Sequence, residues 1–110
     1  MYNAFPRIRV DARGIWCDDR PDLSSGIYWD GIMEISGVEL ATTADWQVVI
    51  ELQHSSGYIL EIREDWPGFK DAVDALTQNL PGIAENWLDQ IRVPKDRQQS
   101  ATVWRRVTSC

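Results

Sequence analysis

Residues 46–69 constrain the fold of this chain more than any other segment. Apolar and polar residues alternate from Trp46 onward, and after a turn signal at residues 55–57 a second apolar row returns as far as Ile62. Alternation with a period of two is typical of half-buried strands, so these residues predict a β-hairpin. The hairpin leads into Trp66-Pro67-Gly68-Phe69, which predicts the start of a helix because proline is tolerated in a first turn. Strand pairing followed at once by a helix indicates an α+β protein.

The helix that follows is predicted by apolar residues that recur every three or four positions. They form one stripe, made of Phe69, Ala72, Val73, Leu76 and Leu80. Asp65 is the expected N-cap and Pro81-Gly82 the expected end. We expect the hairpin and the helix to share one core: Val48, Ile50, Leu52, Leu60, Phe69, Val73 and Leu76.

The remaining segments are less periodic. We expect a strand over residues 8–12 that continues past Gly14 to Cys17, a polar loop over residues 18–26 and a strand over residues 27–35. Ser36-Gly37 is expected to be a two-residue hairpin turn with a short returning strand. A short helix is expected over residues 84–92, and a last strand over residues 102–107. The fold expected is one α+β domain, residues 1–110, with an antiparallel sheet of five to six strands. Two hairpins and the final strand build this sheet, and both helices pack on one face.

Charge is distributed unevenly along the chain. Residues 11–89 hold sixteen acidic side chains against four basic ones, a net charge of −12, whereas the two ends carry +6. If the terminal strands lie together, the surface has a basic seam and an acidic remainder. An acidic surface repels phosphate backbones, so nucleic acid is not an expected partner, whereas a basic protein is. The alternative is that the acidity serves only solubility.

No catalytic, metal or cofactor motif is present. The single histidine, His54, adjoins Ser55 and Ser56 but lacks the other parts of a catalytic triad, and we expect it to be a turn residue. Cys17 and Cys110 are expected to be free thiols, with a disulfide as the alternative. Asp18, Asp19 and Asp22 could bind a hard cation, but the EF-hand spacing is absent and a solvated loop is favoured. We therefore expect no enzyme activity, cofactor or metal.

Six tryptophans are many for 110 residues. Those within predicted elements or at a helix start, Trp66, Trp87 and Trp104, are expected in the core. The other three lie at strand ends or beside acidic loops, where exposed aromatics would act as binding anchors. The candidate partner-binding residues are Trp16, Trp29 and Trp46 for apolar contacts, and Asp18, Asp19, Asp22, Asp71 and Asp74 for charge contacts.

A resemblance adds to this interpretation. The hairpin and helix start of residues 49–69, the helix exit Leu80-Pro81-Gly82-Ile83, Trp87 and Trp104-Arg105-Arg106 resemble the pattern of small acidic bacterial proteins. Such proteins are similar to the immunity proteins of toxin systems. The resemblance implies a fold over residues 46–106 and an inhibitor that binds a basic toxin, but it assigns no binding residue.

These observations favour a cytoplasmic, non-enzymatic binding protein, and specifically an immunity protein that occludes a cognate toxin. Neither an apolar run long enough to span a bilayer nor a signal-peptide pattern is seen, so no membrane contact is expected. The alternative is an assembly module that forms homodimers through edge strands over residues 8–12 or 102–107. A third hypothesis is a small-molecule-binding domain on the concave face of the sheet.

Overall fold

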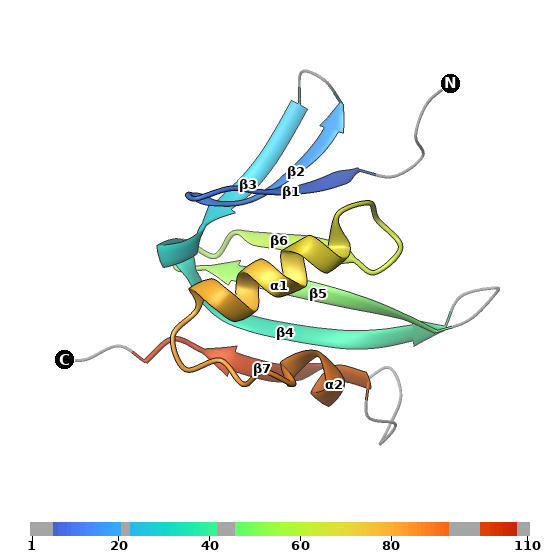
Figure 1. The fold of residues 1–110 in the computed structure, drawn as a ribbon, viewed down its shortest axis with the longest axis vertical. Helices are drawn as coiled ribbons and strands as arrows, with labels where there is room; N and C mark the ends of the chain where they lie inside the picture. Colours follow the sequence, from blue (N-terminus) through green and yellow to red (C-terminus); the bar gives the residue numbers. More distant parts are fainter. Residues whose placement is uncertain (1–5, 21–22, 42–45, 93–99, 108–110) are drawn as a thin grey trace.

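A computed structural model describes residues 6–20, 23–41, 46–92 and 100–107. Within these residues the chain forms seven strands, two α-helices and one 3-10 helix. An N-terminal sheet has the order β1-β2-β3, with β1 at Arg7–Val10, β2 at Gly14–Arg20 and β3 at Leu23–Tyr28. A large sheet has the order β6-β5-β4-β7, with β4 at Ile32–Ala41, β5 at Trp46–His54, β6 at Ile59–Arg63 and β7 at Ala101–Arg105. The helices are η1 at Trp29–Gly31, α1 at Phe69–Asn79 and α2 at Trp87–Arg92. Helix α1 lies over one face of the large sheet, and α2 lies beside β7 (Figure 1).

The α+β class, the hairpin β5–β6 and helix α1 are confirmed. In the hairpin, Ile50 pairs with Ile62 and Leu52 with Leu60, so the two apolar rows face the same side. The prediction of a single sheet is wrong, because the described strands divide between two sheets. All of the expected core is buried except Val73, which is half-buried.

The N-terminal sheet replaces two expected features. Residues 8–17 do not form one continuing strand, because Asp11 reverses the chain: its Oδ1 accepts hydrogen bonds from the N–H groups of Arg13 (2.8 Å) and Gly14 (3.1 Å). Residues 18–26 are not a loop either, since β2 and β3 pair across most of that segment. The result is a meander of short strands in which Ile8, Ile15, Cys17 and Ile27 face the core.

The expected hairpin turn at Ser36-Gly37 is also wrong. Both residues lie in the middle of β4, where Ser36 pairs with Glu51 and Gly37 with Ile50. A Cβ atom at Gly37 would lie 2.4 Å from Cδ1 of Ile91 in α2. The glycine therefore leaves room for helix α2 to pack on the strand. Glycine within a strand often marks such a close approach.

Helix α1 begins after Gly68, which is its N-cap and has a left-handed backbone (φ 90°) with no side-chain cap. Asp65 is therefore not the N-cap that the sequence suggested. Helix α2 is shorter than expected and is held to α1 by the fully buried Trp87, whose indole N–H donates to Oγ1 of Thr77 at 2.9 Å.

The basic seam expected from the terminal strands is absent from the described residues. Strand β1 is an edge of the N-terminal sheet and β7 is an edge of the large sheet, so the two do not pair. They lie apart in Figure 1. Their arginines pair with acids nearby instead: Arg9 with Asp18 at 3.0 Å and Arg105 with Glu34 at 2.8 Å.

Candidate functional site

Trp16, a candidate residue in the N-terminal sheet, lies in a compact cluster with one tyrosine and two arginines. Trp16 and Tyr28 point away from the core, because their strand neighbours Ile15 and Ile27 point into it. The two rings meet edge to face with centroids 5.6 Å apart. Arg9 and Arg13 lie over the Trp16 ring, at 5.9 and 5.4 Å from its centroid. We call these four residues the Trp16 cluster.

Asp11 and Asp18 balance the charge of that cluster. Asp18 accepts hydrogen bonds from the Arg9 guanidinium through both carboxylate oxygens, at 3.0 and 3.3 Å. Asp11 forms an ion pair with Arg13 at 3.4 Å. Asp18 is therefore less available to a basic partner than the sequence suggested.

Two polar groups lower the pKa of Asp11 to about 2: first the indole N–H of Trp16, then the backbone N–H of Arg13. The Trp16 contact does not have the geometry of a hydrogen bond, because its buried Nε1 meets that geometry with none of the described acceptors. The carboxylate therefore stays charged well into acidic pH.

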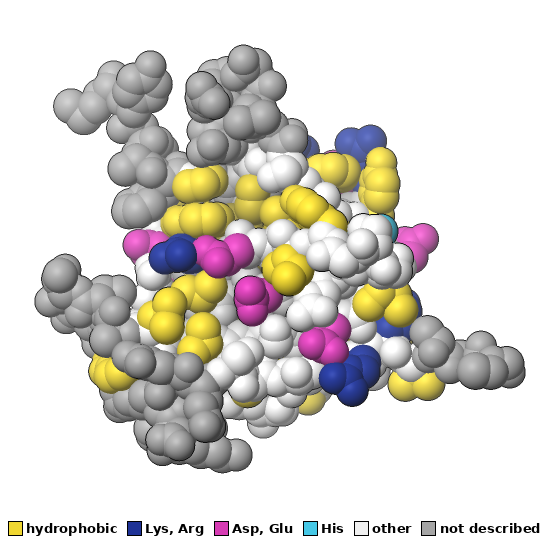
Figure 2. Space-filling model, turned by 180° about the vertical axis from the view of Figure 1, so that it is seen from behind, with side chains coloured by type: hydrophobic (Ala, Val, Ile, Leu, Met, Phe, Trp, Pro, Cys, Tyr) yellow, Lys and Arg dark blue, Asp and Glu magenta, His cyan; other side chains and the backbone are white. Residues whose placement is uncertain are grey.

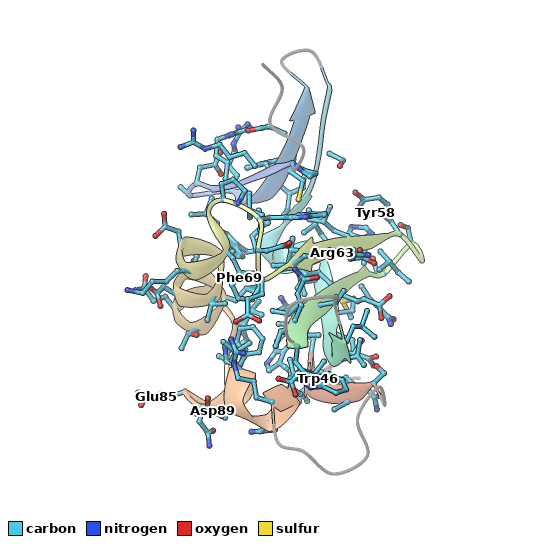
Figure 3. All side chains as sticks on the ribbon, turned by 90° about the vertical axis from the view of Figure 1, so that its right-hand side faces the viewer. Trp46, Tyr58, Arg63, Phe69, Glu85 and Asp89 are labelled. Atoms are coloured by element: carbon cyan, nitrogen blue, oxygen red, sulfur yellow. The ribbon has the colours of Figure 1, made fainter. Side chains whose placement is uncertain are left out.

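The other N-terminal candidates contribute little surface. Trp29 is buried, with 8% of its area exposed, and its indole N–H donates to the carbonyl of Asp11 at 3.2 Å. It fixes η1 to the β1–β2 turn and has almost no surface for a partner. Asp22 lies outside the described residues, as does the side chain of Asp19. Trp46 is half-buried at the start of β5, on the end of the molecule that faces the viewer in Figure 3.

Asp71 and Asp74 belong to a different surface. Residues 64–92, which are described without a gap, carry five exposed acids: Asp65, Asp71, Asp74, Glu85 and Asp89. None of the five forms an ion pair with any residue that the structure describes, and the exposed basic side chain in this segment is Lys70. Glu85 and Asp89 point outward from the helical layer in Figure 3. We call these five residues the acidic helical face; only Asp71 and Asp74 among them are predicted as binding residues from the sequence.

A groove of about 560 Å³ opens where α1 begins, between α1 and α2. Its apolar lining comes from Trp66, Phe69, Val73 and Leu88, and its charged lining from Glu64, Lys70, Asp74 and Arg92. The Phe69 side chain lies between α1 and the strands of the large sheet (Figure 3). Trp66, Phe69 and Val73 were expected in the core, but Trp66 and Val73 are only half-buried, as is Leu88. Trp66 precedes the periodic stripe of the helix, and this was the available signal that it would not be wholly buried.

Glu64 and Arg92, which both line the groove, connect α2 to the large sheet. Glu64 Oε1 accepts from the backbone N–H of Val48 at 3.0 Å, and its other oxygen pairs with the guanidinium of Arg92. The carboxylate therefore connects the last residue of α2 to strand β5. Within the lining the two positive charges balance the two negative ones, so the groove itself is neutral and its surroundings are acidic.

The opposite face of the large sheet carries mixed side chains. Seen from behind, apolar, acidic and basic side chains are interspersed on this side of the molecule (Figure 2). Glu61 and Arg63 of β6 form an ion pair at 2.7 Å there. No single charge dominates this face among the described residues, which distinguishes it from the acidic helical face.

The remaining reactive groups lie in structural settings. The Nδ1 atom of His54 contacts Oγ of Ser56 at 2.9 Å and accepts from the Ser56 N–H at 3.0 Å, so the ring closes the β5–β6 turn. Cys17 is a buried free thiol, and Cys110 lies outside the described residues. Among the described side chains, no three metal-ligating groups come together. No described helix has the length and apolar character to cross a membrane.

Comparison with known proteins finds no matching family model, no matching curated protein and no matching solved structure.

Proposed function

We propose that this protein is a non-enzymatic binding protein that holds a basic protein partner against its acidic helical face. One observation carries the proposal: five exposed acids on one continuous segment have no ion pair in the described part of the chain. Four acids elsewhere pair with nearby arginines: Asp11, Asp18, Glu34 and Glu61. Charge left unpaired on one face attracts an opposite charge and speeds encounter.

The finer proposal is that the partner is a bacterial toxin and that this chain is its cytoplasmic immunity protein. It rests on the acidic face and on the resemblance of residues 46–106 to small acidic proteins of toxin systems. Inhibition would be by occlusion: the helical layer covers a positively charged active site. No group on this chain needs to react.

Co-expression tests the toxin proposal. The gene beside this one is cloned with and without it, and we expect growth arrest by the neighbouring product to be relieved by this protein. Absence of toxicity, or toxicity that this protein does not relieve, would refute the immunity role.

Charge reversal tests which surface binds. Asp74→Lys and Asp30→Lys change the net charge equally at exposed positions, but only Asp74 belongs to the acidic helical face. We expect Asp74→Lys to slow association with the partner by about tenfold at low salt and Asp30→Lys to slow it far less. Equal decreases in the association rate would mean that the net charge of the protein, and not the acidic helical face, attracts the partner.

A second candidate, self-assembly through a sheet edge, is favoured by one observation: both β1 and β7 lie at sheet edges. The edge of β1 is partly occupied, because the N–H of Ile8 donates to the carbonyl of Pro67 at 2.8 Å. Strand β7 is therefore the better candidate. A mass from light scattering that stays monomeric as concentration rises would eliminate it.

A further inference from the structure

We propose that the groove between α1 and α2 is the anchoring subsite of the binding face, and that it takes one aliphatic side chain from a partner segment whose neighbouring residues are lysine or arginine. This inference rests on the proposed function and adds the chemistry of the contact. The groove would supply apolar affinity, and the acids around it would supply the charge contacts.

The lining fits an aliphatic group. Phe69 forms a buried part of the lining, with 8% of its area exposed, and Trp66 and Leu88 add half-buried apolar surface beside it. A volume of about 560 Å³ is ample for one branched side chain and its backbone. Hot spots of protein interfaces are typically such pockets, surrounded by groups that exclude water.

The charges around the groove decide which residues should flank that side chain. Glu64 and Arg92 already pair with each other, so neither attracts a partner strongly. Lys70 and Asp74 also line the groove, and their opposite charges cancel. The excess negative charge comes from Asp65 and Asp71, which flank the start of α1 in the sequence, and from Asp89, which follows Leu88 in α2. A segment with cations on both sides of its apolar residue would place them near these acids, whereas an acidic segment would be repelled.

Two synthetic peptides test the subsite. One is a nine-residue peptide of lysines with a central leucine, and the other has glycine at the centre. Binding is followed by the indole N–H signals of the tryptophans in a proton–nitrogen NMR titration, with Trp66 assigned from a Trp66→Phe variant. We expect the leucine peptide to bind roughly tenfold more tightly, as burial of one aliphatic side chain implies, and to shift the Trp66 signal.

Variants of the lining provide the second measurement. Val73→Thr and Leu88→Gln keep the size of the side chain nearly constant and make the groove polar at half-buried positions. We expect each to reduce the preference for leucine over glycine to about twofold or less while the glycine peptide binds as before. Asp71→Lys should weaken both peptides alike.

The outcomes separate the two proposals. Equal affinity for both peptides, with binding still weakened by Asp71→Lys, would overturn the groove as the anchor and leave the acidic face in place. Binding of neither peptide, or binding that Asp71→Lys leaves unchanged, would overturn the proposed function itself. A leucine preference without any shift of the Trp66 signal would place the apolar contact elsewhere and would also overturn the subsite.

Discussion

A Cβ atom at Gly68 would lie 2.0 Å from the carbonyl oxygen of Ile8. The N–H of the same Ile8 donates to the carbonyl of Pro67 at 2.8 Å, so the helix start and strand β1 meet backbone to backbone. Gly68 also has a positive φ of 90°. Glycine is required here on two grounds, and the contact attaches the N-terminal sheet to the helical layer.

Gly68→Ala should therefore destabilise the protein by about 3 kcal/mol or more, since strain at positive φ adds to a clash with backbone. Gly57→Ala is the matched control, because Gly57 has a φ of 94° but nothing within 4 Å of its missing Cβ. The control should cost only about 1–2 kcal/mol. Urea unfolding measures both; equal losses would show that the close approach to Ile8 contributes nothing.

Asp11 should make the stability of the protein depend on pH in the acidic range. Its folded-state pKa of about 2 lies below the ordinary value of 3.8, so its carboxylate stabilises the fold above about pH 4, and this contribution is lost as pH falls toward 2. Asp11→Asn keeps the oxygen that accepts from Arg13 and Gly14 but removes the charge. We expect the variant to lose less stability than the wild type between pH 4 and pH 2 in thermal melts. A change of the same size in Asp30→Asn, an exposed control, would contradict this assignment.

Trp87 and Thr77 should be energetically coupled, because the indole N–H of Trp87 donates to Oγ1 of Thr77. Thr77→Val leaves that N–H buried without its partner, at a cost of about 1–3 kcal/mol. Trp87→Phe removes the donor and some volume at a fully buried site. In a double-mutant cycle read by denaturant unfolding, we expect a coupling of about 1 kcal/mol. Additive effects would show that the bond contributes nothing to holding α2 on α1.

Cys17 should react slowly in the folded protein. Burial, with a smaller effect of Asp18, raises the pKa of its thiol from 9.0 to about 11. At pH 8 this lowers the reactive thiolate fraction by about 100-fold, and limited access lowers the rate further. In a Cys110→Ser background, alkylation by iodoacetamide should be at least about 100-fold faster in urea than in buffer. Comparable rates would mean that β2 opens readily.

Two of the errors in the predicted fold concern glycines. The sequence predicts a turn at Gly37, but this glycine makes space for Ile91. The sequence predicts a loop at Gly26, yet this glycine pairs with Trp16 across β2 and β3, where a Cβ would lie 2.0 Å from the indole ring. A turn glycine and a glycine under a bulky neighbour are identical in sequence. Only the position of the neighbour distinguishes them.

The candidate site could be predicted in part. Asp71 and Asp74 fall off the apolar stripe of the helix, and their exposure follows from that periodicity. The neutralisation of Asp18 by Arg9 could not be predicted, because it depends on the β1–β2 pairing that sets Arg9 opposite Trp16 and Asp18 opposite Arg7. The groove could not be predicted either, because residues of both α1 and α2 line it. The spacing of residues along the sequence does not specify how two helices pack against each other.

The sequence by itself determined the elements whose signals are local. Alternation specified the hairpin β5–β6, and the spacing of Phe69, Ala72 and Leu76 specified α1, because side-chain direction repeats with the period of the backbone. The tertiary structure alone decided the division into two sheets, the passage of β4 through Gly37 and the acids that remain unpaired. Each of these depends on contacts between residues distant in the chain, such as Gly68 with Ile8, which no local pattern encodes.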